Sequence, residues 1–466
     1  MRIQTRAVVA APLLLLLCAF APPPAPTAAK PPCGLPVIAT AAPVYNPLAA
    51  LTNLDGERFP QGAQLLLIDH GKAQPLVSGF AATADAQVYY DGMRVLFAGK
   101  KQPSDHWSIW EVTLADHILT QVASAPTDLV RPFYMPGRRM IYARRAAHGF
   151  TIELAAIFPD EPVPAVELTH IQAPALPVAV MRDGRVLFEA GFPLGTSLSQ
   201  GAKPELFLVY ADGSGVESYR CDHESIANGR WGGQELASGD TVFTHGTTLA
   251  RFTSPKAVEQ PIHAPAAEYA GQIAETQDGA WITSTRKPGG RFTLVLMHPG
   301  SPLQQPLFVD PARDLVEPVL ACTHPTPKRH PSGLHDWPTA NLMALDVRQS
   351  RQGDLATVPP TVQLEQQDDN GNPVVMGTAP IESDGSFFVK VRGDRPIRFT
   401  LLDPAGKPIR AQHGWFWIRA GEQRICVGCH TGPERASENH VPLVLLHTTT
   451  PVDLSGLATK PTAEAK

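Results

Sequence analysis

The sequence lacks an excess of basic charge, because 39 lysines and arginines stand against 44 aspartates and glutamates and the net charge is −5, with a pI near 6.3. Nucleic-acid binders carry a basic footprint, so this class of protein is excluded. Charged residues are also few, at 18%, whereas hydrophobic residues make up 43% of the 466 positions. This composition is too apolar for a chain that is disordered throughout. We therefore expect a globular protein with a sizeable core.

Long apolar runs are missing after the N-terminal region, where no stretch reaches the roughly 18 residues of a membrane-spanning helix. Proline and glycine, in contrast, are abundant, with 47 and 37 residues, and together exceed their average usage of about 12% by half. Both residue types interrupt helices and form turns. The sequence therefore predicts an all-β protein, with no transmembrane segment once a leader has been removed.

The first 29 residues have the three parts of a secretory signal peptide. Two arginines lie within residues 1–6, an apolar stretch with five consecutive leucines follows, and small residues precede a cleavage point after Ala29. We predict export to the periplasm or the extracellular space, with residues 30–46 as a Pro/Ala-rich N-terminal segment. Anchoring as a lipoprotein through Cys18 is the alternative, but the bulky Leu17 stands where lipoprotein signals have a small residue.

Two of the six cysteines belong to the motif Cys426-Val427-Gly428-Cys429-His430. The CxxCH pattern is that of c-type haem attachment. Two thiols at this spacing add to the two vinyl groups of haem, and the imidazole of the next residue then binds the iron. The sequence predicts one covalent haem c, attached to Cys426 and Cys429, with His430 as the proximal iron ligand.

A zinc site and a thioredoxin-like redox pair are the alternatives to haem at this motif. Zinc would need a second pair of ligands at finger-like spacing, and no other CxxC or HxxxH pattern follows downstream. A redox pair would lie at the start of a βαβ pattern, whereas the residues before Cys426 read as a strand at 414–418 and a turn at 419–422. Both alternatives are weaker than haem attachment.

Three further cysteines remain after removal of the leader: Cys33, Cys221 and Cys322. In an oxidising compartment a disulfide can join Cys221 to Cys322, or Cys33 to either of them, and one thiol is left over. The sequence does not choose among these pairings.

A short unit recurs between residues 48 and 320, a turn, often Asp-Gly, followed by a short apolar strand. The turn glycines are 45, 47, 55 and 40 residues apart: Gly92, Gly137, Gly184, Gly239 and Gly279. An earlier copy at Gly62 gives a sixth unit. A period of about 40 to 50 residues with several short strands per unit is typical of β-propeller blades. We predict a six-bladed β-propeller over residues 47–320; a large β-sandwich, or two, is the alternative.

The composition shifts to proline, histidine and basic residues after this region, as in His324-Pro325-Thr326-Pro327-Lys328-Arg329-His330-Pro331. We interpret residues 321–338 as a linker, or as a crossover that follows the protein surface. The histidines of this segment, with His335, are expected to be solvated loop residues. Lining a metal or a haem edge is their alternative role.

Residues 339–450 are interpreted as a small β-sandwich-like domain that bears the haem motif. Apolar residues predict strands at 342–347, 384–391 and 396–402, the second with a half-buried alternation. A turn follows the third strand at 403–406.

An aromatic strand lies just before the haem motif, and its Trp415, Phe416 and Trp417 either wall a porphyrin or pack in a core. Beyond Pro451 the chain is a mixture of Ser, Ala, Thr, Lys and Glu. This composition predicts a disordered tail over residues 451–466.

The C-terminal third resembles the middle domain of the hydrazine synthase alpha subunit and its relatives. The residues that carry the resemblance are Asp384-Gly385-Ser386-Phe387, Leu402-Asp403-Pro404-Ala405-Gly406, Gly421-Glu422-Gln423-Arg424 and the CxxCH motif. A propeller precedes this domain in the family, so the resemblance implies one haem c on a periplasmic scaffold. The family also has a further haem domain and a tyrosine iron ligand just after the motif. Here no second CxxCH occurs and Thr431-Gly432-Pro433-Glu434 contains no tyrosine, which argues against hydrazine chemistry.

The sixth iron position has several candidate ligands. His413, thirteen residues before Cys426, is favoured, His440 is next, and His447 and Met376 follow. A protein ligand at this position makes an electron-transfer haem, whereas an open position permits small-molecule chemistry.

Two functions of different classes follow. In the first, the chain is an exported mono-haem c-type cytochrome that transfers electrons to or from a redox partner protein docked on a propeller scaffold. In the second, it is a haem oxidoreductase that acts on a small nitrogen or oxygen compound at the interface between propeller and haem domain. One haem without a second redox centre favours the first, and a binding module whose CxxCH holds no haem is a third, weaker interpretation.

Overall fold

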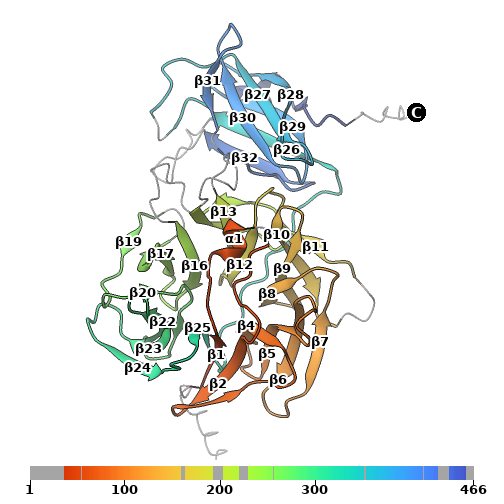
Figure 1. Ribbon diagram of the computed structural model, residues 1–466. Coiled ribbons are helices and arrows are strands. Elements are labelled where there is room, and N and C mark those ends of the chain that lie inside the picture. The colour runs from red at the N-terminus through yellow and green to blue at the C-terminus, as the bar shows by residue number, and fades with distance from the viewer. Residues whose placement is uncertain are drawn as a thin grey trace, which may run out of the picture.

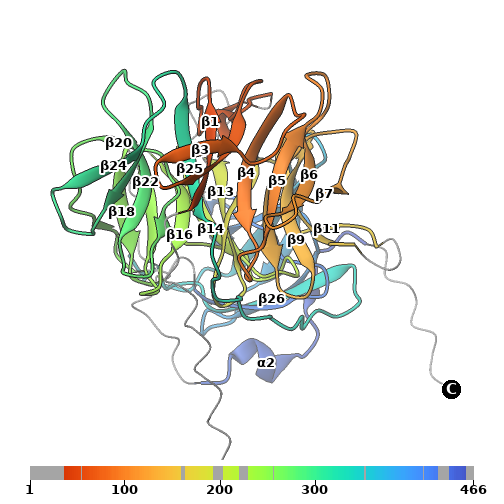
Figure 2. The ribbon, with the colours of Figure 1, turned by 90° about the horizontal axis from the view of Figure 1, so that it is seen from below.

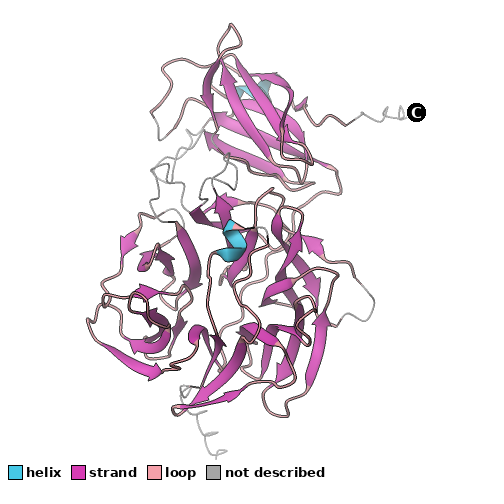
Figure 3. Ribbon diagram, viewed as in Figure 1, coloured by secondary structure: helices cyan, strands magenta, loops and turns pink. Residues whose placement is uncertain are grey.

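Strands account for nearly all of the regular structure in this protein (Figure 3). The computed structural model describes residues 36–53, 55–158, 163–192, 203–219, 229–254, 257–350, 353–412, 414–428 and 440–457. The helices in this part of the chain are short, α1 (Ala49–Thr52) and α2 (Leu443–His447). Neither of them has the length and apolar character needed to span a membrane. The all-β class that the composition predicts is confirmed.

Within the described residues, six antiparallel sheets follow one another between residues 37 and 320. In hydrogen-bonding order, the first three sheets are β25 (Asp314–Leu320), β1 (Val37–Ala42), β2 (Gln64–Asp69) and β3 (Lys72–Pro75); β4 (Ala82–Val88), β5 (Arg94–Lys100), β6 (Ser108–Thr113) and β7 (Leu119–Ala123); and β8 (Leu129–Met135), β9 (Arg139–Ala146), β10 (Gly149–Ala156) and β11 (Val166–Glu167).

The other three sheets continue this order: β12 (Ala175–Val180), β13 (Val186–Phe192), β14 (Lys203–Val209) and β15 (Glu217–Ser218); β16 (Arg230–Glu235), β17 (Thr241–His245), β18 (Thr248–Phe252) and β19 (Gln260–Pro261); and β20 (Glu268–Tyr269) with β21 (Ala274–Glu275), then β22 (Trp281–Arg286), β23 (Thr293–Met297) and β24 (Gln304–Phe308).

The six sheets are arranged in a ring that the two ends of the region close (Figure 1). β1 pairs with β25 in antiparallel fashion, from Val37 opposite Leu320 to Ala42 opposite Asp314. Figure 2, turned by 90°, shows the strands of neighbouring sheets standing side by side. This arrangement is consistent with the predicted β-propeller, and we refer to residues 36–320 as the propeller.

The structure corrects the predicted start of this region. Residues 30–46 were expected to precede the propeller, yet all six residues of β1 are buried and this strand closes the ring. The turn at Gly62 leads into β2, the third strand of its sheet, whereas the other repeated turns lead into second strands. The strand equivalent to those second strands is β1, so the Gly62 turn belongs to the sheet that β1 and β25 close but is not a copy of the repeat.

The repeated Asp-Gly turns owe their form to local hydrogen bonds. The carboxylate of Asp91 accepts a hydrogen bond from the backbone N–H of Met93 at 2.8 Å, and Asp183 accepts one from Arg185 at 3.0 Å. Gly92 has a φ of 75°, in the left-handed region that glycine adopts without strain. The sequence repeat therefore marks these turns reliably, because each turn is determined by adjacent residues.

The Pro/His-rich segment of residues 321–338 crosses the face of the propeller that carries these turns. The backbone N–H of His324 donates to Tyr90 O at 3.1 Å, and that of Lys328 donates to Arg182 O at 2.8 Å. A Cβ on Gly184 would lie 2.3 Å from Lys328 O, so the turn glycine also makes room for the crossing chain. The backbone of this segment therefore follows the surface of the propeller.

The centre of the propeller is filled by buried ion pairs. β-Bulges in β4, β8 and β25 hold Asp85, Arg131 and Glu317 at positive φ angles of 61°, 50° and 54°. Arg58, from the segment that contains α1, pairs with Asp85 and, at 2.6 Å, with Glu317. Arg131 pairs with Glu189 at 2.6 Å. The segment between β1 and β2 thereby covers the centre of the ring on the face opposite the crossover.

Residues 339–457 form two four-stranded sheets around one hydrophobic cluster, a β-sandwich arrangement. One sheet is mixed, with parallel pairings at both edges, and the other is antiparallel. The strands of the two sheets are β32 (Gln423–Gly428), β26 (Thr339–Asp346), β29 (Phe387–Arg392) and β33 (Val452–Asp453); and β28 (Pro373–Pro380), β27 (Thr361–Gln367), β30 (Ile397–Leu402) and β31 (Pro408–Ala411). We call these residues the sandwich domain.

The start of the predicted disordered tail is corrected as well. Residues 451–457, which were assigned to the tail, contain β33, which pairs in parallel with β29. Leu454 is 6% exposed and belongs to the core cluster of the sandwich domain. Backbone pairing with β29, a hydrogen bond between Ser455 and Asp453 and the burial of Leu454 together hold this segment on the sandwich domain.

Candidate functional site

Cys426, the first cysteine of the CxxCH motif, lies on β32 at the edge of the mixed sheet. β32 pairs in parallel with β26, and Ala344 is opposite Cys426. Cys426 packs against the core of the sandwich domain, whereas the preceding Ile425 is 63% exposed. The alternation along β32 therefore turns the first thiol of the motif inward from an open sheet edge.

The thiol of Cys426 is free, whereas Cys322 is disulfide-bonded. Burial raises the pKa of the Cys426 thiol, and the nearby Arg424 guanidinium opposes this shift. The thiol is thus kept protonated and out of disulfide exchange.

Several predicted residues lie outside the described part of the chain, and their assignments stay predictions. They are the signal peptide with Cys18, then Cys33, Cys221, His413, Cys429 and His430. Among the residues that the structure describes, no group of three or more His, Cys, Asp or Glu side chains is placed to hold a metal ion.

His440 lies at the same end of the sandwich domain as the haem motif. Its Nε2 is 3.4 Å from an Asp384 carboxylate oxygen, and Asp384 also accepts the backbone N–H of Leu443 at 2.7 Å. The turn at Asp384 leads into β29, whose Phe387 is opposite Ala344. Because Ala344 is also opposite Cys426, one row across the sheet connects this turn to the motif.

The two weaker ligand candidates have other contacts. His447 Nδ1 lies 3.0 Å from a carboxylate oxygen of Glu382. Met376 is half-buried and packs against the core of the sandwich domain. Both side chains therefore have structural roles in the described part of the chain.

The histidines of the crossover are spread along the propeller face, each beside an aromatic ring. His324 meets Tyr90 edge-on at 5.2 Å, and His330 stacks on Tyr210 at 4.0 Å. His335 stacks on Trp337 at 4.2 Å. All three histidines are nevertheless exposed, in line with the expected solvated loop residues.

The aromatic segment before the motif was predicted to be a strand. It is instead an irregular stretch with one isolated bridge between Phe416 and Ile397. Phe416 packs against the sandwich core, and Trp415 lies under the guanidinium of Arg398 at 4.5 Å. Trp417 is 1% exposed and belongs to a hydrophobic cluster of the propeller. Core packing thus explains these rings, and Trp417 joins the two domains.

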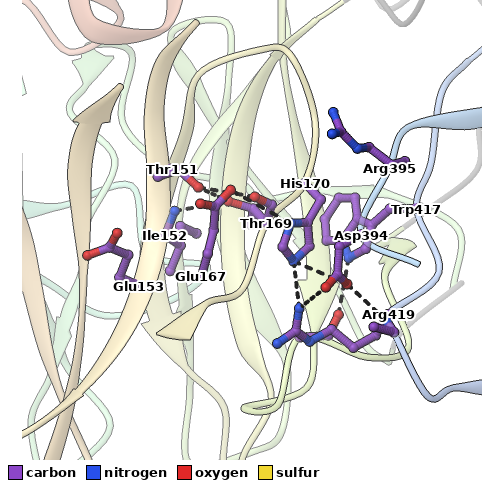
Figure 4. Close-up of polar contacts among 12 residues, drawn as sticks. Thr151, Ile152, Glu153, Glu167, Thr169, His170, Asp394, Arg395, Trp417 and Arg419 are labelled. Carbon is purple, nitrogen blue, oxygen red and sulfur yellow. Dashed lines mark hydrogen bonds and ion pairs between the residues drawn. The ribbon is translucent and has the colours of Figure 1, made fainter. Parts of the chain in front are cut away.

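A polar cluster surrounds Trp417 at the domain interface (Figure 4). Trp417 Nε1 donates to Gly213 O at 3.1 Å, and Arg419 Nε donates to Asp212 O at 3.0 Å. Arg419 Nη1 lies 3.1 Å from His170 Nε2 and also donates to Asp394. Because a guanidinium only donates hydrogen bonds, His170 Nε2 is the acceptor and the ring proton is on Nδ1.

His170 is held in its neutral form. Burial lowers the pKa of His170 to about 4; the Asp394 carboxylate opposes this shift, and the Arg419 guanidinium adds to it. The ring also meets Trp417 edge-on at 6.0 Å. Since the Nε2 lone pair is occupied by Arg419, the arrangement fastens two domains together and does not form an acid-base centre.

The same interface is connected to the strand that carries the motif. Glu422 accepts hydrogen bonds from Gly215 N of the propeller at 3.2 Å and from Arg424 Nε at 2.9 Å. Arg424 lies on β32, two residues before Cys426. Sequence reasoning missed this network, because its members are single polar residues up to 249 positions apart and no periodic pattern marks them.

The class of protein that these features define is an all-β chain with a propeller followed by a sandwich domain whose edge strand carries the first cysteine of the motif. Comparison with known proteins identifies the second part. The hydrazine synthase alpha subunit middle domain family matches residues 345–431, from β26 through the CxxCH motif. This segment is therefore similar to that domain, and the resemblance that the sequence motifs indicated is confirmed.

Two relatives illustrate the extent of the similarity. Hydrazine synthase subunit alpha of Kuenenia stuttgartiensis is 34% identical over 61 residues, which are 13% of this chain and 8% of that protein. The solved structure of Kuenenia stuttgartiensis hydrazine synthase matches with a TM-score of 0.74 at 15% identity, over 89% of this chain and 72% of that chain. The sequence match covers a small part of the relative, and the structural match extends a shared fold over most of this chain.

Proposed function

We propose that the chain is an exported mono-haem c-type cytochrome that exchanges electrons with a partner protein, on a six-bladed propeller scaffold. The observation that carries this proposal is Cys426, a free thiol on the open edge strand β32, at the first position of a CxxCH motif. The motif lies within the segment that matches the hydrazine synthase alpha subunit middle domain. Residue type, spacing and edge position together fit covalent haem attachment.

Five residues of this chain have roles in the proposal. Cys426 and Cys429 would form the two thioether bonds, His430 would be the proximal iron ligand, and His413 or His440 the distal one. Bound haem supplies one-electron transfer at its iron. His440 is supported by its place near the motif end of the sandwich domain, where Asp384 orients its ring.

The interface between the domains supports a carrier more than a catalytic cleft. Trp417, Arg419 and Glu422 all bond to the propeller, so the sandwich domain is fixed in place. An edge strand on a fixed domain can present the haem to a docked partner without a conformational change. A small-molecule oxidoreductase with an open sixth position is the alternative outcome of the test below.

The test is an absorption spectrum of the full chain, produced with a haem-attachment system, in the oxidised and the reduced state with and without carbon monoxide. Low-spin bands that carbon monoxide does not change are expected, because a protein ligand fills the sixth position. A high-spin haem that binds carbon monoxide would assign the chain to the oxidoreductase class instead. Absence of any haem bands would overturn both.

Covalent attachment is tested separately by haem staining of denaturing gels. Cys426→Ser is expected to weaken the stain strongly, because one thioether bond is lost, whereas the exposed neighbour Ile425→Ala should keep it. His413→Ala and His440→Ala are then compared in the spectrum, with His447→Ala as the matched control. An unchanged spectrum in both of the first two variants would exclude them as distal ligands.

A further inference from the structure

A cavity of about 420 Å³ lies at the centre of the propeller, on the face that the crossover follows. The ends of the inner strands form its wall, and residues of the crossover form part of its rim. His324 is fixed at this rim, with Nε2 3.0 Å from Val88 O and its ring against Tyr90. The rim is thus a built part of the cavity rather than a loose loop.

The cavity is blind. Deeper along the ring axis, the space narrows to about 20 Å³, lined by Tyr45, Asp85, Arg131 and Glu317. Tyr45 OH donates to Glu317 at 3.0 Å, and Tyr45 N donates to Asp314 at the opposite end of β25. The buried ion pairs therefore form the floor, and a ligand would enter and leave on the crossover side. The size is in the usual range of small-molecule pockets.

Four glutamines line the cavity, of which Gln277 is exposed and the other three are Gln87, Gln234 and Gln272. All three are half-buried, and none of their amides makes a hydrogen bond with another residue in the described part of the chain. A primary amide offers two donors and two acceptor lone pairs. Half-buried polar groups are normally satisfied by a protein group, water or a ligand. Three such amides around one blind cavity indicate a partner with several hydroxyl groups.

The charges at the wall disfavour an anion. Arg182 is the cation there, and it already pairs with Glu235 at 3.4 Å and donates to Leu236 O at 2.7 Å. Glu275 accepts the backbone N–H of Ala237 at 2.6 Å and keeps one carboxylate oxygen for a further donor. Phe133 and Tyr134 add apolar and aromatic surface. Carboxylates and amides beside aromatic rings match a neutral polyhydroxy compound.

We propose that this cavity binds a small neutral molecule rich in hydroxyl groups, of the size of a mono- or disaccharide, through Gln87, Gln234 and Gln272. The glutamine amides exchange hydrogen bonds with its hydroxyl groups. This site does not involve the haem motif, so its test does not depend on the cytochrome proposal.

The test is calorimetric titration of the full chain with glucose, maltose and gluconate. Saturable binding of glucose or maltose is expected, with gluconate weaker by roughly tenfold or more, because Arg182, the cation at the wall, is already paired with Glu235. No saturable binding of either neutral sugar up to about 20 mM would overturn the proposal. Binding of gluconate as tight as that of glucose would overturn it too.

Three variants connect the binding to the amides. Gln87→Leu and Gln234→Leu are each expected to weaken sugar binding by roughly tenfold. The isosteric Gln87→Glu tests the same contact without a change of volume and should also weaken it. Gln74→Leu, on the exposed outer strand β3, is the matched control and should bind as the unchanged chain does. Equal binding by all four variants, with unchanged melting temperatures, would contradict the assignment to this cavity.

Discussion

His170 shows how one residue can join two domains without a charge of its own. The propeller supplies His170 and Glu167, and the sandwich domain supplies Asp394 and Arg419, which face the ring (Figure 4), while the positive charge of Arg395 also disfavours protonation of His170. A charged imidazole here would lose its hydration and stand beside Arg419. The neutral ring instead accepts the Arg419 hydrogen bond, so the contact depends on the protonation state of His170.

The low pKa of His170 makes the stability of the protein depend on pH. Between its ordinary pKa of 6.5 and its folded value of about 4, the unfolded chain binds a proton that the folded chain does not. The contribution of His170 to the free energy of unfolding is therefore full above about pH 6.5. It falls by roughly 2 to 3 kcal/mol as the pH approaches 4. We expect urea midpoints measured across this range to show the loss.

The contribution of His170 is isolated by comparison with His170→Asn, which cannot titrate. This variant is expected to be less stable at pH 7 and to lose less stability on acidification than the unchanged chain. His263→Asn, at an exposed position, is the control and should follow the unchanged chain. Identical slopes for all three proteins would contradict the role assigned to His170.

Arg58 is the central cation of the ion pairs at the ring centre, with 3% of its side chain exposed. Arg58→Met would leave the carboxylates of Asp85 and Glu317 with less compensation in a buried site. We expect a loss of about 3 to 5 kcal/mol in the free energy of unfolding at pH 7. The deficit should shrink near pH 5, because protonation removes the uncompensated charge.

Two further variants test the explanation for Arg58. Arg58→Met/Glu317→Gln is expected to recover part of the loss, since it removes one of the two carboxylates. Arg251→Met breaks a surface pair with Asp240, in which 44% of the arginine side chain is exposed, and should cost less than about 1 kcal/mol. A loss of the same size in Arg251→Met and Arg58→Met would show that burial is not the cause.

Among the secondary-structure elements, the sequence predicted those that are specified by local patterns of residues. The Asp91-Gly92 and Asp183-Gly184 turns are determined by adjacent residues, and the strands after them were predicted close to β5 and β13. The 414–418 segment was predicted as a strand from its aromatic residues. Its Trp417 instead enters the propeller, because a contact between distant segments outweighs local β propensity.

β33 is an element that composition concealed, and its contribution can be measured. Leu454 follows this two-residue strand and fills the core of the sandwich domain. Leu454→Ala is expected to lower the free energy of unfolding by about 2 to 4 kcal/mol, through lost burial and a residual cavity. Val452→Ala, at a position that is 37% exposed, is the matched control with a small effect. Equal effects of the two changes would mean that Leu454 adds no core packing and that this segment belongs to the predicted disordered tail.

The whole molecule depends on two long-range connections that no local pattern marks. The sandwich domain is joined to the propeller through Trp417 and Arg419, and the propeller is closed by β1 and β25. The repeated turns mark five of the six sheets, but they could not show which strand completes the remaining sheet, because that strand comes from the other end of the region. Which strand pairs with the edge strand β25 depends on how the ring closes, and the repeated units do not encode it.

Ring closure gives the last prediction. β1 is held on both sides, since Ile38 is opposite Val319 of β25 and Leu67 of β2, and Ile38 is fully buried. Ile38→Asp would place an unpaired carboxylate in the sheet that joins the first and last strands of the propeller. We expect a loss of more than about 4 kcal/mol, since burying an unpaired charge is among the costliest single changes.

Hydrogen exchange followed by mass spectrometry would locate this loss. If closure stabilises the ring as a whole, Ile38→Asp should increase exchange in all six sheets, including β9 and β17 on other sides of the ring. Ala73→Asp, in the exposed edge strand β3 of the same sheet, is the matched control and should change stability by no more than about 0.5 kcal/mol. Faster exchange confined to β1, β2 and β25 would mean instead that each blade is stable by itself, and that the pairing of β1 with β25 only completes one sheet.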